Sequence, residues 1–317
     1  MRRPALYLTS GLVIALVATA CSSPDSPDSP TAARSSSGLP DASSPTTAPD
    51  RSALQDVRRP RTAADTARVL EAAEAAIRRP ADADELTHAG QLQQLAYKEL
   101  ALHPDWDAQV RAAVPPPLRG VVRANVTARR EFRAMHPSSA ADLATELPAW
   151  RISPPPPLPV LRASYAEAER RFDVDWSVLA AIHLTETVFG RIDGVSSAGA
   201  QGPMQFLPTT WEMYGAGGDI HDPHDAILAA GRLLQANGFA RDPDGAIWRY
   251  NNSDRYVRGI RAIASVLERR PWALAGYREW QVYYLTRAGS VWLPDGYDQP
   301  RPVPVRIYLR QHPDALR

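Results

Sequence analysis

The sequence predicts a mainly α-helical protein with a helical N-terminal layer and a short C-terminal β-hairpin. Apolar residues recur at helical spacing over residues 62–102 and again over 114–135, which favours amphipathic helices. Residues 280–293 are instead rich in Val, Tyr and Trp around Ala288-Gly289-Ser290, which is typical of a hairpin. With an apolar share of 44% in 317 residues, the chain has enough apolar side chains for a globular core.

The N-terminus carries an export signal. Two arginines precede an apolar run over residues 12–17, and small residues follow, as in a secretory signal peptide over residues 1–20. This run is too short for a membrane span, which needs about 20 residues. The only cysteine, Cys21, follows directly, and a single cysteine cannot form an internal disulfide. The run Ala18-Thr19-Ala20-Cys21 resembles a bacterial lipobox, which predicts that Cys21 is lipidated.

Residues 21–61 predict a disordered lipoprotein tether. They are mostly Ser, Pro, Asp, Thr and Ala, and they bury too little apolar surface to offset the entropy lost on ordering. About 40 extended residues reach roughly 140 Å. We therefore expect an exported protein that is anchored to the membrane by lipid and faces the cell wall, although lipoproteins with other functions carry similar tethers.

The charge balance argues against a nucleic-acid partner. Lys and Arg together number 36 and Asp and Glu 35, so the formal net charge is only +1. Binding to nucleic acid depends mainly on basic side chains that neutralise phosphates. We expect no nucleic acid among the partners.

Prolines divide the folded part of the chain. A helical run begins at Thr62 and Asp65, which form a helix N-terminus. The cluster Pro154–Pro157 cannot continue a helix or lie inside a sheet. The predicted divisions are, in order, a helical accessory region over 62–147, a Pro-rich linker over 148–160, a second helical domain over 161–270 and a C-terminal hairpin extension over 271–317.

Capping signals place three helices in the second domain. Ser164 and Glu167 form a capping box for a helix to Phe172, and Asp175 caps another helix to about Phe189. The run Asp222-Pro223-His224-Asp225 has a capping acid, a proline at the first helical position and a third-position acid. A helix start explains this run better than a metal site does.

Glu186 occupies an unusual position on the helix after Asp175. It lies on the same face as Ile182 and Phe189, where the pattern expects an apolar side chain. Burial disfavours a carboxylate, so the pKa of Glu186 should rise above its reference value of about 4.3, as a general acid requires. The alternative is a structural Glu that pairs with an Arg in the core or extends into solvent.

Two further segments fit a sugar-binding cleft. The run over residues 196–208 is a loop of small residues in which Gly199 and Gly202 permit tight turns, and Gln205 offers an amide to a sugar. Tyr250 and Asn251 follow a helical stretch and add a phenol and an amide. Each segment alone is a weak signal.

Taken together, Glu186-Thr187, the run over 196–205 and Tyr250-Asn251 resemble the lytic transglycosylases of the goose-lysozyme-like superfamily (SLT type). In that family a Glu-Ser pair, a Ser-x-x-Gly-Ala-x-Gly-Leu-Met-Gln run and an Ala-Tyr-Asn motif occur in this order. The resemblance covers about residues 161–268. Thr187 stands where Ser is usual but keeps a hydroxyl, and Pro203 stands where Leu is usual, as in the variant resembling actinobacterial lipoprotein members.

The resemblance implies a lysozyme-like catalytic domain and a peptidoglycan lytic transglycosylase. Such an enzyme cleaves the β-1,4 bond between N-acetylmuramic acid and N-acetylglucosamine and leaves 1,6-anhydro ends, with no metal or organic cofactor. Glu186 would be the catalytic residue. The implied substrate-binding residues are Ser196, Met204 and Gln205, which line the cleft, and Tyr250 and Asn251, which contact the reacting sugar.

Two other functions stay open. A hydrolytic muramidase on the same fold would use Asp193 or Asp219 to position water, because hydrolytic glycosidases need a second carboxylate. A non-catalytic wall-binding lipoprotein would keep the cleft, with Glu186 in a structural role.

The remaining polar and aromatic residues have ordinary explanations. His88 and His103 are isolated, and His183 lacks the partner of a metal-binding HExxH motif. Trp211 and Trp248 lie near the motifs, where core packing is a more common role than sugar stacking.

Overall fold

The structure is a computed structural model that describes residues 58–135 and 142–316. The predicted signal peptide, Cys21 and nearly all of the predicted tether lie outside the described residues. The end of the tether segment is described and packs on the folded part: Pro60 is buried, and Arg59 forms an ion pair of 3.0 Å with Glu99. No helix within residues 58–135 and 142–316 is long and apolar enough to cross a membrane.

The protein is mainly helical, as the sequence predicts. The helices are α1 (Ala63–Arg78), α2 (Ala83–Leu102), α3 (Asp107–Ala113), α4 (Pro116–Met135), α5 (Leu158–Phe172), α6 (Trp176–Thr187), α7 (Pro208–Tyr214), α8 (Pro223–Ala236), α9 (Pro243–Asn251), α10 (Asp254–Arg269), α11 (Ala273–Arg278) and α12 (Val305–Gln311). The strands are β1 (Glu146–Leu147), β2 (Arg151–Ile152), β3 (Ile192–Asp193), β4 (Val282–Thr286), β5 (Gly289–Leu293) and β6 (Val303–Pro304).

The predicted helix starts are confirmed at two positions. The Thr62 hydroxyl accepts a hydrogen bond of 3.1 Å from the Asp65 amide at the start of α1. Asp222 accepts one of 2.9 Å from the Asp225 amide at the start of α8, with Pro223 at the first helical position. Short polar side chains satisfy amides that have no partner within the helix, which fixes where each helix begins.

The predicted start of α5 was wrong. The helix begins at Leu158, directly after the proline run, because a proline is tolerated in the first turn of a helix. Ser164 therefore lies inside the helix, where its hydroxyl donates to the Val160 carbonyl at 3.0 Å. Asp175 does precede α6, but the carboxylate that accepts from the first amide of α6 belongs to Glu169, at 3.0 Å.

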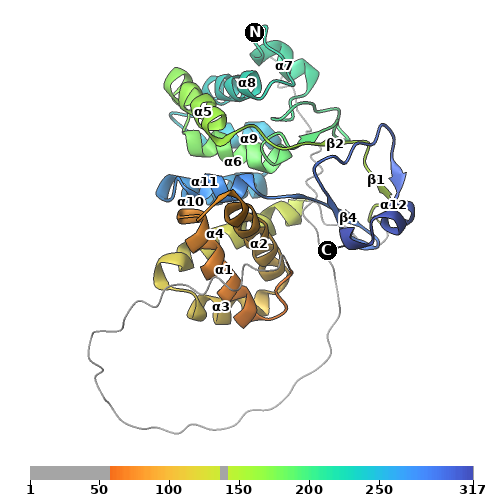
Figure 1. Cartoon of the computed structure of the whole chain (residues 1–317). Helices are drawn as coiled ribbons and strands as arrows, with labels where there is room; N and C mark the ends of the chain where they lie inside the picture. Colours follow the sequence, from red (N-terminus) through yellow and green to blue (C-terminus); the bar gives the residue numbers. More distant parts are fainter. Residues whose placement is uncertain (1–57, 136–141, 317) are drawn as a thin grey trace, which may run out of the picture.

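Helix α10 connects the two halves of the helical part. It packs against α4 on one side and α6 on the other, and Figure 1 shows α10 and α11 in blue between the orange and yellow N-terminal helices and the green α5 and α6. Its buried side chains include Tyr256, Ile260, Ile263 and Leu267, spaced for one helix face. The accessory region and the second helical domain thus share one hydrophobic core, which extends from Ala63 to Trp280.

A second, smaller core lies in the strand-rich part at the right of Figure 1. The predicted hairpin is confirmed as β4 paired with β5 in antiparallel register, with Tyr284 opposite Val291. The segment predicted as a linker contributes to this part as well, since it contains β2, which pairs with β3. Directly before this segment, β1 pairs with β6. Trp150 and Ile152 from that segment are buried in this core, so the proline-rich stretch is packed against the strands and helices on both sides of it.

Candidate active site

Glu186 lies in the last turn of α6 and is 7% exposed. The phenol of Tyr256, which is fully buried at the start of α10, donates a hydrogen bond of 2.6 Å to its Oε1 atom. The contact between α6 and α10 therefore places a polar partner directly on the buried carboxyl group. Tyr256 was missed in the sequence, although it stands on the apolar face of α10 where a polar hydroxyl needs a partner.

The pKa of Glu186 is raised from its ordinary value of 4.5 to about 8. The larger cause is burial, which penalises the charged form, and the hydrogen bond from Tyr256 acts in the opposite direction. The predicted rise is confirmed. At neutral pH the carboxyl group holds its proton, so it can act as a proton donor without a further activating group.

An unusual backbone turn follows Glu186. Val188, Phe189 and Gly190 all adopt left-handed backbone angles, with φ of 55°, 62° and 78°. Such a conformation is costly for a β-branched residue and persists only where surrounding contacts hold it. Thr187 supplies two of these contacts: its hydroxyl donates to the Pro203 carbonyl at 2.5 Å and accepts from the Gly190 amide at 2.9 Å.

The glycine-rich loop is fixed in the same way. Gly199 and Gly202 have positive φ values of 84° and 72°, and a side chain at Gly202 would overlap the Ile220 carbonyl. The Ser196 hydroxyl accepts from the Ala200 amide at 3.0 Å and closes the loop. Gln205, itself at a φ of 49°, donates its amide to the carbonyls of Gly194 and Gly202. These bonds hold both polar side chains beside the end of α6.

We call the first hollow beside Glu186 the motif cleft. Its space is about 570 Å³, including its open mouth. Ser196 and Gln205, both predicted to bind substrate, line it together with Glu186. Two aromatic residues that the sequence did not single out, Trp150 and Tyr284, stand edge to face with ring centroids 5.5 Å apart. The lining residues are Pro148, Trp150, Glu186, Ile192, Gly194, Val195, Ser196, Ser197, Gln205 and Tyr284.

The other three predicted substrate-binding residues lie deeper. Met204 is fully buried, and its carbonyl accepts a hydrogen bond of 2.7 Å from the Tyr250 hydroxyl. Tyr250 stacks nearly parallel to Tyr256 at 6.3 Å, and Asn251 is 8% exposed. These three side chains line neither hollow beside Glu186, so their contact with a sugar stays a prediction.

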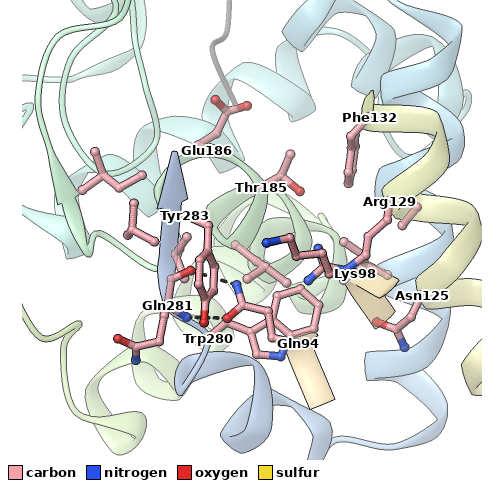
Figure 2. A pocket seen from close by; sticks show the side chains of 16 residues that line it. Gln94, Lys98, Asn125, Arg129, Phe132, Thr185, Glu186, Trp280, Gln281 and Tyr283 are labelled. Atoms are coloured by element: carbon pink, nitrogen blue, oxygen red, sulfur yellow. Dashed lines mark hydrogen bonds between the residues drawn. The ribbon is translucent and has the colours of Figure 1, made fainter. Parts of the chain in front are cut away.

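We call the second hollow beside Glu186 the basic pocket, with a space of about 780 Å³ including its mouth. Figure 2 shows Lys98 from α2 and Arg129 from α4 reaching toward its interior, with Glu186 at the opposite side. Glu186 and Ile192 line both hollows, so the two adjoin. The lining residues are Gln94, Lys98, Asn125, Ala128, Arg129, Phe132, Leu184, Thr185, Glu186, Val188, Ile192, Ile263, Trp280, Gln281, Val282 and Tyr283.

Glu186 is the single carboxyl group among the described residues that line these two hollows. Asp193, weighed as a second carboxylate, forms an ion pair of 2.5 Å with Arg151 across the β2–β3 pair. Asp219 accepts from the His221 amide at 2.9 Å in the turn before α8. Neither aspartate lines the motif cleft.

The other polar and aromatic residues fill structural positions. His183 is fully buried and bonds the Tyr165 hydroxyl at 2.8 Å, and burial lowers its pKa to about 3. His88 is exposed, and His103 stacks on Trp106. Trp211 and Trp248 pack against the large core. Within residues 58–135 and 142–316, no group of three or more His, Cys, Asp and Glu side chains is arranged to hold a metal ion.

Comparison with known proteins found no matching family model, no similar curated protein and no similar solved structure.

Proposed function

We propose that this protein is a peptidoglycan lytic transglycosylase with a lysozyme-like catalytic domain. The observation that carries the proposal is that one buried carboxyl group, Glu186, stands alone among the described residues that line the two hollows and stays protonated at neutral pH. Enzymes that hydrolyse glycosides commonly need two carboxyl groups on either side of the bond, separated by about 5 to 9.5 Å. A site with one carboxyl group fits a reaction in which the substrate supplies its own nucleophile.

In the proposed reaction Glu186 first donates its proton to the glycosidic oxygen between N-acetylmuramic acid and N-acetylglucosamine. The bond from this oxygen to C1 of the muramic acid breaks, with assistance from the acetamido group of the same sugar. The 6-hydroxyl then attacks C1, and its proton passes to the carboxylate of Glu186. One bond breaks and one forms, no water is consumed, and Glu186 returns to its starting protonation state.

The remaining cleft residues fit this chemistry. Ser196 and Gln205 are held by bonds to the loop backbone, which limits their motion at the cleft wall. Trp150 and Tyr284 supply aromatic surface for a sugar face. No metal or organic cofactor enters the proposed reaction.

Mass spectrometry of digested peptidoglycan tests the proposal. Each product of the transglycosylase should be lighter by one water than the product of a muramidase, because the 6-hydroxyl replaces water as nucleophile. Products with ordinary reducing ends would favour the hydrolytic muramidase. Binding to peptidoglycan without any turnover would favour the non-catalytic wall-binding lipoprotein.

We also propose that the protein is exported and held at the outer face of the cell membrane by lipid on Cys21. Two or more acyl chains anchor a protein stably, since each buried CH₂ contributes about 0.8 kcal/mol. Cys21→Ser should release the mature protein from the membrane fraction in a fractionation experiment. An unchanged distribution would contradict the lipid anchor.

A further inference from the structure

The basic pocket holds two buried basic side chains. Lys98 is 6% exposed and Arg129 is 5% exposed, and they extend from different helices, α2 and α4 (Figure 2). Burial is the main cause that lowers the pKa of Lys98, and the charge of Arg129 contributes in the same direction. Buried charges in proteins are normally paired, because removing an ion from water costs several kcal/mol.

Arg129 lacks such a pair. Its Nε and Nη2 atoms are buried and have no hydrogen-bond partner among the described residues. The guanidinium group lies over the Trp280 ring, 4.6 Å from its centroid, and its Nε and Nη2 donors are unused. Burial lowers the pKa of Arg129 to about 10, so the group is still charged at neutral pH.

The nearby acids do not neutralise this charge. Glu186 is the single carboxyl group among the described lining residues, and it is protonated at neutral pH. Glu99 lies next to Lys98 in the chain and its charge raises the pKa of Lys98, but Glu99 forms its ion pair with Arg59, at 3.0 Å, and does not line the pocket. Lys98 itself donates to the Ser290 hydroxyl at 2.7 Å and lies over the Tyr283 ring. The pocket therefore carries an uncompensated positive charge beside Glu186.

We propose that the basic pocket binds a carboxylate carried by the muramic acid residue of the substrate. A guanidinium group presents a planar set of donors that matches a carboxylate, and buried unpaired donors provide the strongest gain when such a partner arrives. Part of the remaining wall is apolar, including Phe132, Ile263 and Trp280, which suits a short aliphatic group that carries the carboxylate.

The position of the pocket selects this ligand. Because the basic pocket adjoins the motif cleft at Glu186 and Ile192, a group bound there would be attached to a sugar next to the bond that is cleaved. The inference rests on the proposed function for its choice of sugar. Two carboxylates are possible sources: the lactyl carboxylate of a residue whose peptide stem has been removed, or a carboxylate of the stem itself.

Binding to the inactive Glu186→Gln variant tests the inference by calorimetry. The three ligands are a tetramer of N-acetylglucosamine without a carboxylate, an alternating tetrasaccharide with free lactyl carboxylates, and the same tetrasaccharide with peptide stems. In this background Arg129→Met should weaken binding of a carboxylate ligand about 10- to 100-fold and leave the uncharged tetramer unchanged. The matched control is Arg123→Met, an exposed position on the same helix, which should change none of the affinities.

The outcomes separate the two proposals. A selective loss with the stem-free ligand identifies the lactyl carboxylate, and a selective loss with the stem-bearing ligand identifies the stem. An equal loss of affinity for all three ligands would assign Arg129 a structural role against Trp280 and overturn the inference. Binding of all three with no effect of Arg129→Met would overturn the inference alone, whereas no binding of any ligand would overturn the proposed function with it. If Arg129→Met does not fold, Lys98→Met provides the same test.

Discussion

The motif cleft and the basic pocket share Glu186 and Ile192 but come from different parts of the chain. Most of the cleft derives from residues 148–205, whereas the pocket joins α2 and α4 to α6, α10 and the start of the hairpin. Both are lined by the buried acid Glu186, but among the described residues only the pocket also contains buried basic groups, Lys98 and Arg129. Glu186 can take up a proton and become neutral, but an arginine remains charged at neutral pH. The difference indicates that the cleft is suited to proton transfer and the pocket to holding an anion.

The largest expected effect separates catalysis from binding. Glu186→Gln should reduce glycan cleavage by about 10² to 10⁴ or more, because Gln keeps the shape of the side chain but cannot donate a proton. Binding to peptidoglycan and the fold should persist, since the basic pocket and the loop contacts are unaffected. The release of soluble fragments, measured against an exposed Glu212→Gln control, provides the comparison. Full activity in Glu186→Gln would end the catalytic assignment.

The second effect concerns stability, where the two buried groups should act in opposite pH windows. The pKa of Glu186 is raised in the folded state. Its contribution to the free energy of unfolding is therefore fully present below pH 4.5 and is lost as the pH rises to about 8. Burial is the main cause that lowers the pKa of Lys98 in the folded state, from 10.5 to about 7. Its contribution to the free energy of unfolding is therefore fully present above pH 10.5 and is lost as the pH falls to about 7.

Replacing each group by a neutral side chain should therefore change the free energy of unfolding, relative to wild type, in a pH-dependent way over that group's own pH range. Relative to wild type, Glu186→Gln should gain a free energy of unfolding on the order of 5 kcal/mol as the pH rises from 4.5 to 8. At pH 7, Lys98→Met should exceed wild type in free energy of unfolding by a comparable amount, and this difference should disappear as the pH rises to 10.5. Urea unfolding across this pH range measures both differences. A difference that does not vary with pH would contradict burial as the cause.

The next effect tests the turn that joins the motif cleft to Glu186. Thr187→Val keeps the shape of the side chain but removes the hydroxyl that bonds Pro203 and Gly190. Since two buried backbone groups lose their partner, the free energy of unfolding should fall by about 1 to 3 kcal/mol, and cleavage should fall with it. Thr187→Ser keeps the hydroxyl and should stay close to wild type in both thermal unfolding and activity. Equal behaviour of the two variants would show that the hydroxyl does not hold the turn.

Sequence patterns predicted the features that depend on neighbouring residues. The caps of α1 and α8, the hairpin and the burial of Glu186 all follow from spacing within one element. The start of α5 did not, because two competing signals, Pro157 and Ser164, lie seven residues apart and the helix begins after the proline run. Contacts between distant elements, such as that of Tyr256 with Glu186, depend on helix packing that no local spacing encodes.

The basic pocket was not predicted, although the sequence contains one signal for it. Arg129 lies three residues after Val126 and seven after Val122 on the buried face of α4, the same kind of position that marked Glu186 on α6. Lys98, the only lysine in the chain, lies three residues after Leu95 on a buried face of α2. A charged residue on an apolar face can equally form a structural ion pair, so this signal by itself does not place the N-terminal helices at the site.

The smallest expected effect tests how far helix packing tunes the acid in the motif cleft. Tyr256→Phe keeps the ring between Phe132 and Tyr250 but removes the hydrogen bond of 2.6 Å to Glu186. Because this bond favours the ionised carboxylate, its loss should raise the pKa of Glu186 further and move the alkaline limb of the pH–rate profile to higher pH. One such bond contributes about 0.5 to 1.5 kcal/mol, so the rate at neutral pH should change by no more than about tenfold. Tyr165→Phe removes a comparable buried bond, to His183, away from both hollows and should leave the profile in place. If Tyr256→Phe also left the alkaline limb unmoved, the group that titrates there would not be Glu186, and the acid in the cleft would have to be sought elsewhere.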